Sequence, residues 1–345
     1  MRQLLAAALV SRALAAAALG AVAMATAALV VVALAAAPVV AEPAIVYSLG
    51  GKFDKSFNES AFRGVERYAA RMSQEVAEFE PSTPAQFEQA LRRYAGRGHD
   101  PVVAIGFLQV AAVEKVAAEF PDTRFAIVDA VAEGPNIRSV VFREHEGAYL
   151  AGIAAASTSQ TGIIGFVGGM DIPLIQRFAC AYAQGALAAN PEIKVLVAMT
   201  GDTPAAFADP VRGAELARSQ IDQGADVIMQ AAGGTGVGVL QAAAEAGILG
   251  IGTDSDQNGL HPGAMLASVV KRVDVAVVQS FDAARSGTWQ SGIYDLGLKE
   301  GGIELVGSTL IEGALQAYLL GAFDMIVAGE RPVHNLYTDG PCPFL

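Results

Sequence analysis

Polar side chains that could bind a small molecule follow short apolar segments at several places along the chain. Asp54 and Asn58 come after the first such segment beyond residue 42, and Asp129 and Asp254 directly follow later ones. Carboxylate oxygens accept hydrogen bonds, so these residues suit a ligand with several hydroxyl or amino groups. One aspartate at such a place is more often a turn residue. Several in succession indicate a binding site.

Aromatic residues accompany these carboxylates. Phe57 and Phe62 lie just after the first apolar segment, and Phe207 lies in a later loop. A phenylalanine ring stacks on a flat ligand ring, so carboxylates and aromatics together suit a polyhydroxylated molecule that carries such a ring. A structural interpretation also applies to this region, in which Ser56 or Asn58 caps the next helix and Phe62 packs in the core.

The sequence does not show the motifs of a cofactor site or a hydrolytic enzyme. The run Gly233–Gly238 approximates a dinucleotide-binding motif, but its third glycine falls one position early. The pattern G-x-S-x-G is absent from the sequence. The histidines do not have the spacing of metal ligands; they are His99, His145, His261 and His334. We expect a binding protein without catalytic activity, cofactor or metal.

The elements that position these residues alternate regularly. Apolar segments that read as buried strands are separated by amphipathic ones, such as Thr83–Arg97, which places Phe87, Leu91 and Tyr94 on one helical face. Such alternation predicts an α/β fold with parallel strands. In parallel sheets, ligands bind at the carboxyl ends of the strands. The polar residues above all lie at such ends.

The chain beyond the leader is about 300 residues long, which is too long for one compact core and predicts two lobes. A second set of alternating segments begins at Thr161. We expect a first lobe of residues 42–158 plus about 272–306, and a second of residues 159–271 plus about 307–345. Strands that cross between the lobes would join them.

Residues 1–41 have the composition of a secretory signal peptide. Arg2 and Arg12 are their charged residues, and the segment ends in small residues at Val39 and Ala41. We therefore expect export to the periplasm. The alternative is a retained anchor, because the apolar run exceeds the roughly 18–20 residues that span a bilayer. No cysteine lies near its end, so we do not expect a lipid anchor.

The net charge limits the kinds of binding partner, and the two cysteines raise the question of a disulfide. Beyond residue 41 the chain has 35 acidic and 21 basic residues, a net charge of −14, which disfavours nucleic acid. The two cysteines, Cys180 and Cys342, can form a disulfide in an oxidising compartment. Alternatively, Cys180 is simply a small buried residue.

Six segments together resemble the basic membrane protein family of ABC-importer substrate-binding proteins, whose best-understood members are purine nucleoside receptors. The resemblance runs from about Ala44 to Asn335. The segments are Asp54–Asn58, Phe142–Gly147, Gly165–Met170, Ala232–Gly236, Gly252–Gln257 and Lys271–Asp274.

This resemblance implies a type I periplasmic-binding-protein fold, with two Rossmann-like lobes that close on a ligand in the cleft. It also implies an ABC permease in the inner membrane as partner, and we expect a monomer. By family pattern, Asp54 and Asp129 meet the edge of the base while Phe62 and Phe207 stack on its faces.

The same pattern implies that Asp254 and Lys271 hold the ribose hydroxyls and that Gly234 lets the backbone approach the ligand. The segment Gly50–Phe53 differs from the usual acidic pair of the family, so the base preference stays open. A ligand sensor, a binding protein for a sugar or another small metabolite, and a nucleoside hydrolase are the alternatives.

Overall fold

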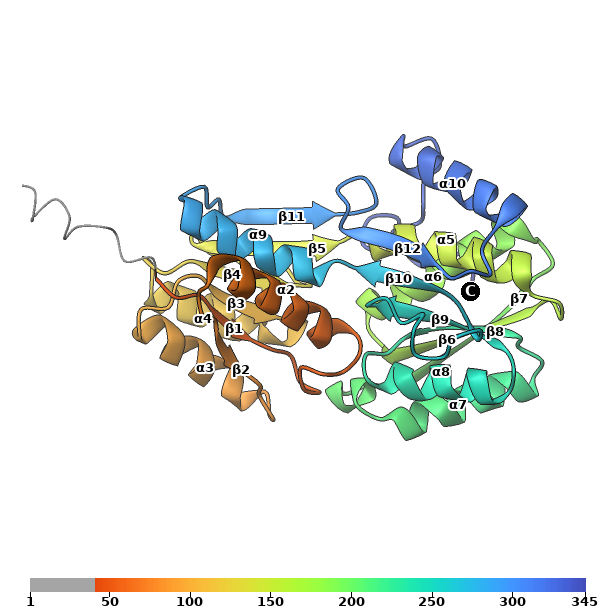
Figure 1. The fold of residues 1–345 in the computed structure, drawn as a ribbon, viewed down its shortest axis with the longest axis horizontal. Helices are drawn as coiled ribbons and strands as arrows, with labels where there is room; N and C mark the ends of the chain where they lie inside the picture. Colours follow the sequence, from red (N-terminus) through yellow and green to blue (C-terminus); the bar gives the residue numbers. More distant parts are fainter. Residues whose placement is uncertain (1–40) are drawn as a thin grey trace, which may run out of the picture. The chain divides into compact units, whose positions relative to one another are not determined.

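The computed structural model describes residues 41–345 and contains two six-stranded sheets (Figure 1). The first sheet has the strand order β11-β5-β4-β3-β1-β2 and the second β12-β10-β9-β8-β6-β7. Neighbouring strands are parallel, with the exception of β10 and β12, which pair antiparallel. The predicted α/β architecture with two lobes is confirmed.

The first sheet is covered by helices on both faces. Its strands are β1 (Ala44–Val46), β2 (Ala77–Phe79), β3 (Val102–Ile105), β4 (Phe125–Val128), β5 (Ile137–Phe142) and β11 (Gly292–Leu296). Its helices are α2 (Phe57–Met72), α3 (Ala85–Gly96), the 3-10 turn η1 (Phe107–Gln109), α4 (Val110–Glu119) and α9 (Val273–Ser286). Because side chains alternate along a strand, Ile45 packs in the core beneath α2 and α9, and Val46 packs in the core beneath α3 and α4.

The second sheet is built in the same way. Its strands are β6 (Ile163–Met170), β7 (Lys194–Gly201), β8 (Val227–Ala231), β9 (Leu249–Asp254), β10 (Met265–Lys271) and β12 (Ile303–Gly307). Its helices are α5 (Glu144–Thr158), α6 (Pro173–Ala189), the 3-10 turn η2 (Pro204–Phe207), α7 (Pro210–Asp222), α8 (Thr235–Glu245) and α10 (Gly313–Val327). Helices α5 and α6 pack backbone to backbone, since a Cβ at Gly152 would lie 2.0 Å from the carbonyl oxygen of Tyr182.

The chain passes between the lobes at β5 to α5, at β10 to α9 and at β11 to β12. These crossovers are hydrogen bonded to one another. The Arg143 N–H donates to the carbonyl oxygen of Leu296 at 2.9 Å, and the Arg272 N–H donates to that of Gly302 at 2.9 Å. The crossovers therefore form one narrow connection about which the lobes can rotate.

Two segments lie in a different lobe from the one that we expected. Strand β12 was expected in the first lobe but pairs with β10 in the second sheet, which satisfies its backbone hydrogen bonds there. Helix α5 was also expected in the first lobe, but its Ala- and Gly-rich surface packs on α6. We propose lobes of 42–143 plus 272–302 and of 144–271 plus 303–345.

The two cysteines are joined, since Cys180 in α6 and Cys342 near the C-terminus form a disulfide across 162 residues of sequence. The expected signal peptide or anchor falls on residues 1–41 and so, apart from Ala41, outside the described residues. Between residues 41 and 345, no helix combines the length and apolar character needed to cross a membrane.

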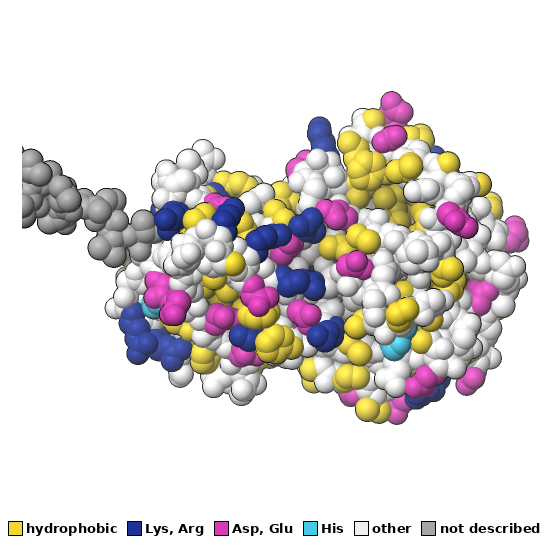
Figure 2. Space-filling view, viewed as in Figure 1, with side chains coloured by type: hydrophobic (Ala, Val, Ile, Leu, Met, Phe, Trp, Pro, Cys, Tyr) yellow, Lys and Arg dark blue, Asp and Glu magenta, His cyan; other side chains and the backbone are white. Residues whose placement is uncertain are grey.

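Helix α10 is largely apolar yet only Leu319 and Ala322 in it are buried. Tyr318 and Leu320 are exposed, and a hollow of about 1110 Å³, part of it open to solvent, lies between α10, β12 and α5. Figure 2 shows apolar side chains gathered beside this helix, and basic side chains mainly over the first lobe and the middle of the face shown.

Candidate ligand-binding site

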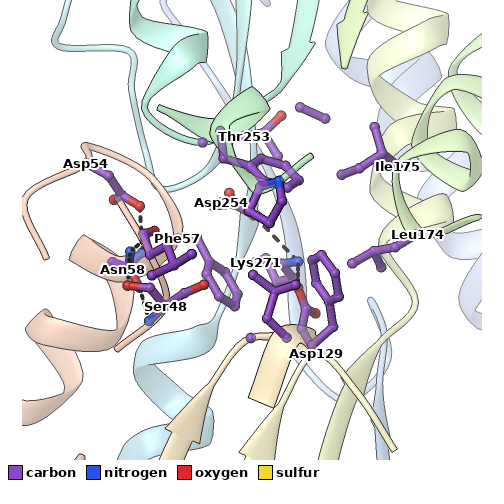
Figure 3. A pocket seen from close by; sticks show the side chains of 18 of the residues that line it. Ser48, Asp54, Phe57, Asn58, Asp129, Leu174, Ile175, Thr253, Asp254 and Lys271 are labelled. Atoms are coloured by element: carbon purple, nitrogen blue, oxygen red, sulfur yellow. Dashed lines mark hydrogen bonds and ion pairs between the residues drawn. The ribbon is translucent and has the colours of Figure 1, made fainter. Parts of the chain in front are cut away.

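A cavity of about 700 Å³, part of it open to solvent, lies between the two lobes (Figure 3). Its lining is formed by Ser48, Leu49, Asp54, Phe57, Asn58, Gly106, Phe107, Leu108, Asp129, Leu174, Ile175, Phe178, Pro204, Phe207, Ala231, Gly233, Thr253, Asp254 and Lys271. The strand-end rule accounts for its place: Ser48 follows β1, Gly106 follows β3, Asp129 follows β4, and Asp254 ends β9.

The charged centre of the cavity is Lys271, the last residue of β10. Its Nζ lies 2.6 Å from Asp129 Oδ2 and 3.7 Å from Asp254 Oδ1, and only 3% of the residue is exposed. Burial acts to lower the pKa of Lys271, but the charges of Asp129 and Asp254 outweigh it and raise the pKa above its ordinary value. The lysine is therefore a permanent cation held by two carboxylates.

Both of these aspartates have hydrogen-bonding capacity beyond the lysine. Asp129 Oδ1 is buried without a hydrogen-bond partner among residues 41–345. Asp254 accepts a hydrogen bond from Ser56 Oγ at 2.7 Å. Each adopts a left-handed backbone conformation, with φ of 70° and 68°, which aspartate tolerates better than most residues. Burial raises the pKa of Asp254, although Lys271 and Ser56 act in the opposite direction.

Asp54 lies at the cavity but is engaged by the start of α2. Its carboxylate accepts the backbone N–H groups of Ser56, Asn58 and Glu59 at 2.9, 3.0 and 3.1 Å. Burial raises the pKa of Asp54 to about 6, and these N–H groups only partly offset that effect. Within the described residues, no lysine or arginine pairs with this carboxylate.

The side chain of Asn58 is used by the loop after β1. Its Oδ1 accepts from the Ser48 N–H at 3.0 Å, while its Nδ2 donates to the carbonyl oxygens of Gly51 at 3.1 Å and Leu49 at 3.3 Å. Asn58 lines the cavity, but its amide group shapes the loop. The expected cap is wrong, because neither Ser56 nor Asn58 caps α2 with its side chain, and the Asp54 carboxylate accepts the N–H groups at the start of that helix instead.

The aromatic residue that lines the cavity from α2 is Phe57, and Phe62 does not line it. The Phe62 ring instead packs edge-on against Phe53, with centroids 5.2 Å apart, and lies 4.5 Å from Lys52 Nζ. The two phenylalanines are five positions apart, so they point in directions roughly 140° apart on the helix. Helix α2 begins at Phe57, and this start directs Phe57 inward.

Phe207 lines the cavity as expected. Gly234, which we expected at the ligand, does not line it, and its neighbour Gly233 does. A Cβ at Gly169 would lie 2.3 Å from the Phe207 ring, and one at Gly233 would lie 3.5 Å from its Cβ. Gly234 precedes α8 and faces Asp54. These glycines let the Phe207 ring sit against the backbone.

Sequence reasoning did not identify Phe107, Phe178, Leu174 and Ile175, all of which line the cavity. Phe107 lies two residues after the end of β3, so the strand-end rule could have found it. The other three lie in the first turns of α6, the helix that follows β6 in the chain. Their positions depend on how that helix packs against the first lobe.

A family model described as ABC transporter substrate-binding protein, PnrA-like, named Bmp, matches residues 44–335. The ABC transporter nucleoside-binding protein BmpA of Lactococcus lactis is 31% identical over 285 residues, covering 76% of this chain and 80% of that protein. Basic membrane protein A of Borreliella burgdorferi is 34% identical over 274 residues, covering 76% and 79%.

A solved structure of a solute-binding protein of an ABC transporter system from Aeropyrum pernix is also similar. It superposes with a TM-score of 0.77 at 29% identity, covering 86% of this chain and 93% of that one. The likeness extends over both lobes and confirms the periplasmic-binding fold.

Proposed function

The chain belongs to the Bmp family of ABC transporter substrate-binding proteins, and we propose that its ligand is a nucleoside, with a purine nucleoside preferred. The family implies a small-molecule ligand and a membrane permease as partner. The relative from Lactococcus lactis is named as nucleoside-binding, and this supports the choice of ligand.

The observation that carries the proposal is the composition of the cavity. A buried lysine and two carboxylates lie beside four phenylalanine rings: Phe57, Phe107, Phe178 and Phe207. The charged groups suit the paired hydroxyls of a ribose, and the rings suit a flat base.

We assign the residues as follows. Lys271 and Asp254 hold the ribose hydroxyls, and the unpartnered Asp129 Oδ1 accepts a hydrogen bond from the ligand. Phe207 stacks on the base, with Phe57 in the place that we first gave to Phe62. Asp54 accepts from the base edge where its helix contacts leave room.

Binding would proceed by closure of the lobes about their crossovers. Hydrogen bonds already join the lobes beside the cavity. Ser255 Oγ donates to the carbonyl oxygen of Ser56 at 2.7 Å, and Gln257 Nε2 donates to that of Lys55 at 2.8 Å. Asp254 accepts from Ser56 across the same boundary, so a residue assigned to the ligand also contributes to closure.

We further propose that the protein acts outside the cytoplasmic membrane as a monomer and delivers its ligand unchanged. Incubation with inosine, followed by chromatography for free base, tests the absence of chemistry. Fractionation of cells tests the location, and size-exclusion chromatography with light scattering tests the monomeric state.

The central experiment is isothermal titration of residues 42–345 with inosine, adenosine, guanosine, cytidine, ribose and hypoxanthine. We expect a purine nucleoside to bind most tightly, because both the sugar and the base have partners in the cavity. Thermal shift gives a parallel readout, since a ligand at 100 times its Kd stabilises by about 2.7 kcal/mol. Binding of ribose alone, with no response to any nucleoside, would overturn the proposal.

A further inference from the structure

The C-terminal segment runs along α6 and is attached to it repeatedly. We call residues 332–342 the strap. Its His334 N–H donates to Gln184 Oε1 at 2.9 Å, and Cys342 is bonded to Cys180. Residues 177, 180 and 184 are three and four positions apart, so they lie on one face of α6. The strap follows that face from Gln184 to Arg177, which it meets at Asn335 and Tyr337, and returns to Cys180 at its end.

At residue 177 the strap meets a buried cation. Arg177 is 5% exposed, and its Nη2 donates to the carbonyl oxygen of Phe142 at 2.7 Å and to the carboxylate of Glu144. On its other side, the guanidinium carbon lies 4.5 Å from the centre of the Tyr337 ring, and Nη1 donates to Asn335 Oδ1 at 3.4 Å. Arg177 is thus held between the crossover from β5 to α5 and the strap.

Residues beside Arg177 also surround Lys271 at the centre of the cavity. The rings of Phe142 and of Phe178, the neighbour of Arg177, each lie 5.8 Å from Lys271 Nζ. Glu144 contributes to the charge that raises the pKa of Lys271. A shift of Arg177 would therefore move groups that surround the cation assigned to the ligand.

Glu144 makes this arrangement sensitive to the position of Arg177. Its side chain is fully buried, and its Oε1 has no hydrogen-bond partner among the described residues. A buried carboxylate without enough partners depends strongly on the position of its counter-cation. The strap contacts that counter-cation through Tyr337 and Asn335.

We propose that Arg177 is a positioning residue for ligand binding and that the strap holds it in place through Tyr337 and Asn335. The identity of the ligand rests on the proposed function. The C-terminal strap thereby contributes to ligand binding. The strap fixes the first crossover and the start of α6, and these fix the surroundings of Lys271.

The test uses Tyr337→Ala in residues 42–345 with the disulfide intact, titrated with inosine. Affinity is expected to fall roughly threefold to tenfold, the range of a partly buried cation–π contact. Tyr337→Phe, which retains the ring, is expected to bind like the wild type. Phe344→Ala is the matched control, since that ring contacts His334, at 6.0 Å, and not Arg177.

A second readout separates positioning from general stability and does not need a ligand. Hydrogen exchange of the amides of residues 143–147 is expected to be faster in Tyr337→Ala than in the wild type and unchanged in Phe344→Ala. If another nucleoside of the panel binds the wild type in place of inosine, it replaces inosine in this test. If no nucleoside binds, the proposed function fails, and hydrogen exchange alone tests the role of the strap. If inosine binds and folded Tyr337→Ala binds it as tightly as the wild type does, the inference is overturned.

Discussion

Two buried clusters of charge lie close together in this molecule and are built differently. In the cavity cluster, one lysine, Lys271, faces two carboxylates, Asp129 and Asp254. In the crossover pair, Arg177 faces the single carboxylate of Glu144 and is covered by the strap. The cavity cluster has two carboxylates for its one cation and opens towards the ligand space. The crossover pair is matched one to one and closed.

The comparison teaches that burial of charge alone does not identify a binding site. Both clusters are costly to bury unless they are paired and hydrogen bonded. Each has an unpartnered buried acceptor, Asp129 Oδ1 in the cavity cluster and Glu144 Oε1 in the crossover pair. What distinguishes the cavity cluster is that its acceptor lies beside aromatic rings and open space. The crossover pair has neither the rings on its open side nor the space.

The largest expected effect follows from removing the cation of the cavity cluster. Lys271→Met leaves two buried carboxylates without their counter-charge, so the free energy of unfolding should fall by about 3–5 kcal/mol. Urea denaturation at pH 7 measures this. Lys115→Met is the control, because Lys115 pairs with Glu88 at the surface and its loss should cost less than about 1 kcal/mol. Equal losses in the two variants would mean that the cluster is not held by charge.

The next effect concerns the ligand rather than the fold. Asp254→Asn keeps Lys271 paired with Asp129 but removes one charged acceptor, so affinity for inosine should fall roughly tenfold or more. Calorimetry measures the affinity, and a melting curve checks that the fold persists. Asp256→Asn is the matched control, since that side chain is exposed two residues further on. A binding loss in both variants would place the effect in the loop instead of in the carboxylate.

Asp54 is a further buried carboxylate, and within the described residues no lysine or arginine pairs with it. Its pKa is raised to about 6 in the folded protein, above the unfolded value of about 3.9, so the folded state binds the proton more tightly. Stability from this group is therefore full below about pH 4 and is lost as the pH rises towards 6.

Unfolding measured from pH 4 to 7 in wild type and Asp54→Asn tests this carboxylate. The wild type should lose stability relative to the variant as the pH rises, by on the order of 1–2 kcal/mol. A relative gain with rising pH would show that the N–H groups of α2 outweigh burial and that the pKa is lowered.

The fold could be predicted from the sequence because buried strands and amphipathic helices alternate so regularly. The apolar run Ile137–Phe142 predicts a strand, and β5 has these bounds. The partner of β12 could not be predicted, since an apolar strand does not indicate which sheet it joins. The disulfide was left open for a similar reason, because its formation depends on the path of the strap along α6.

The cavity could be predicted in part. The strand-end rule located Asp54, Asp129 and Asp254, and the family resemblance added Lys271. The rule cannot tell whether a polar group is already in use, as in Asn58, whose amide is bound to the loop. The contacts of these residues with a ligand are predictions.

The choice between Phe57 and Phe62 failed for a more specific reason. A helix turns by about 100° per residue, so the face that each residue presents depends on where the helix begins and how it packs. The sequence pattern predicts this helix from about Ser60 to Met72, and α2 begins three residues earlier, at Phe57. Phe57 therefore covers Lys271, with its ring centre 5.0 Å from Nζ, much as Tyr337 covers Arg177.

This parallel gives the smallest and sharpest prediction. Phe57→Leu should weaken inosine binding by roughly twofold to tenfold, because an aromatic contact contributes about 0.5–1.5 kcal/mol beyond the area it buries. Phe62→Leu should leave affinity unchanged, because its ring packs on Phe53 outside the cavity. Calorimetry on the two variants measures the difference. If Phe62→Leu is the weaker binder, the family pattern describes the stacking residue better than the geometry of α2 does, and the cavity must rearrange around its ligand.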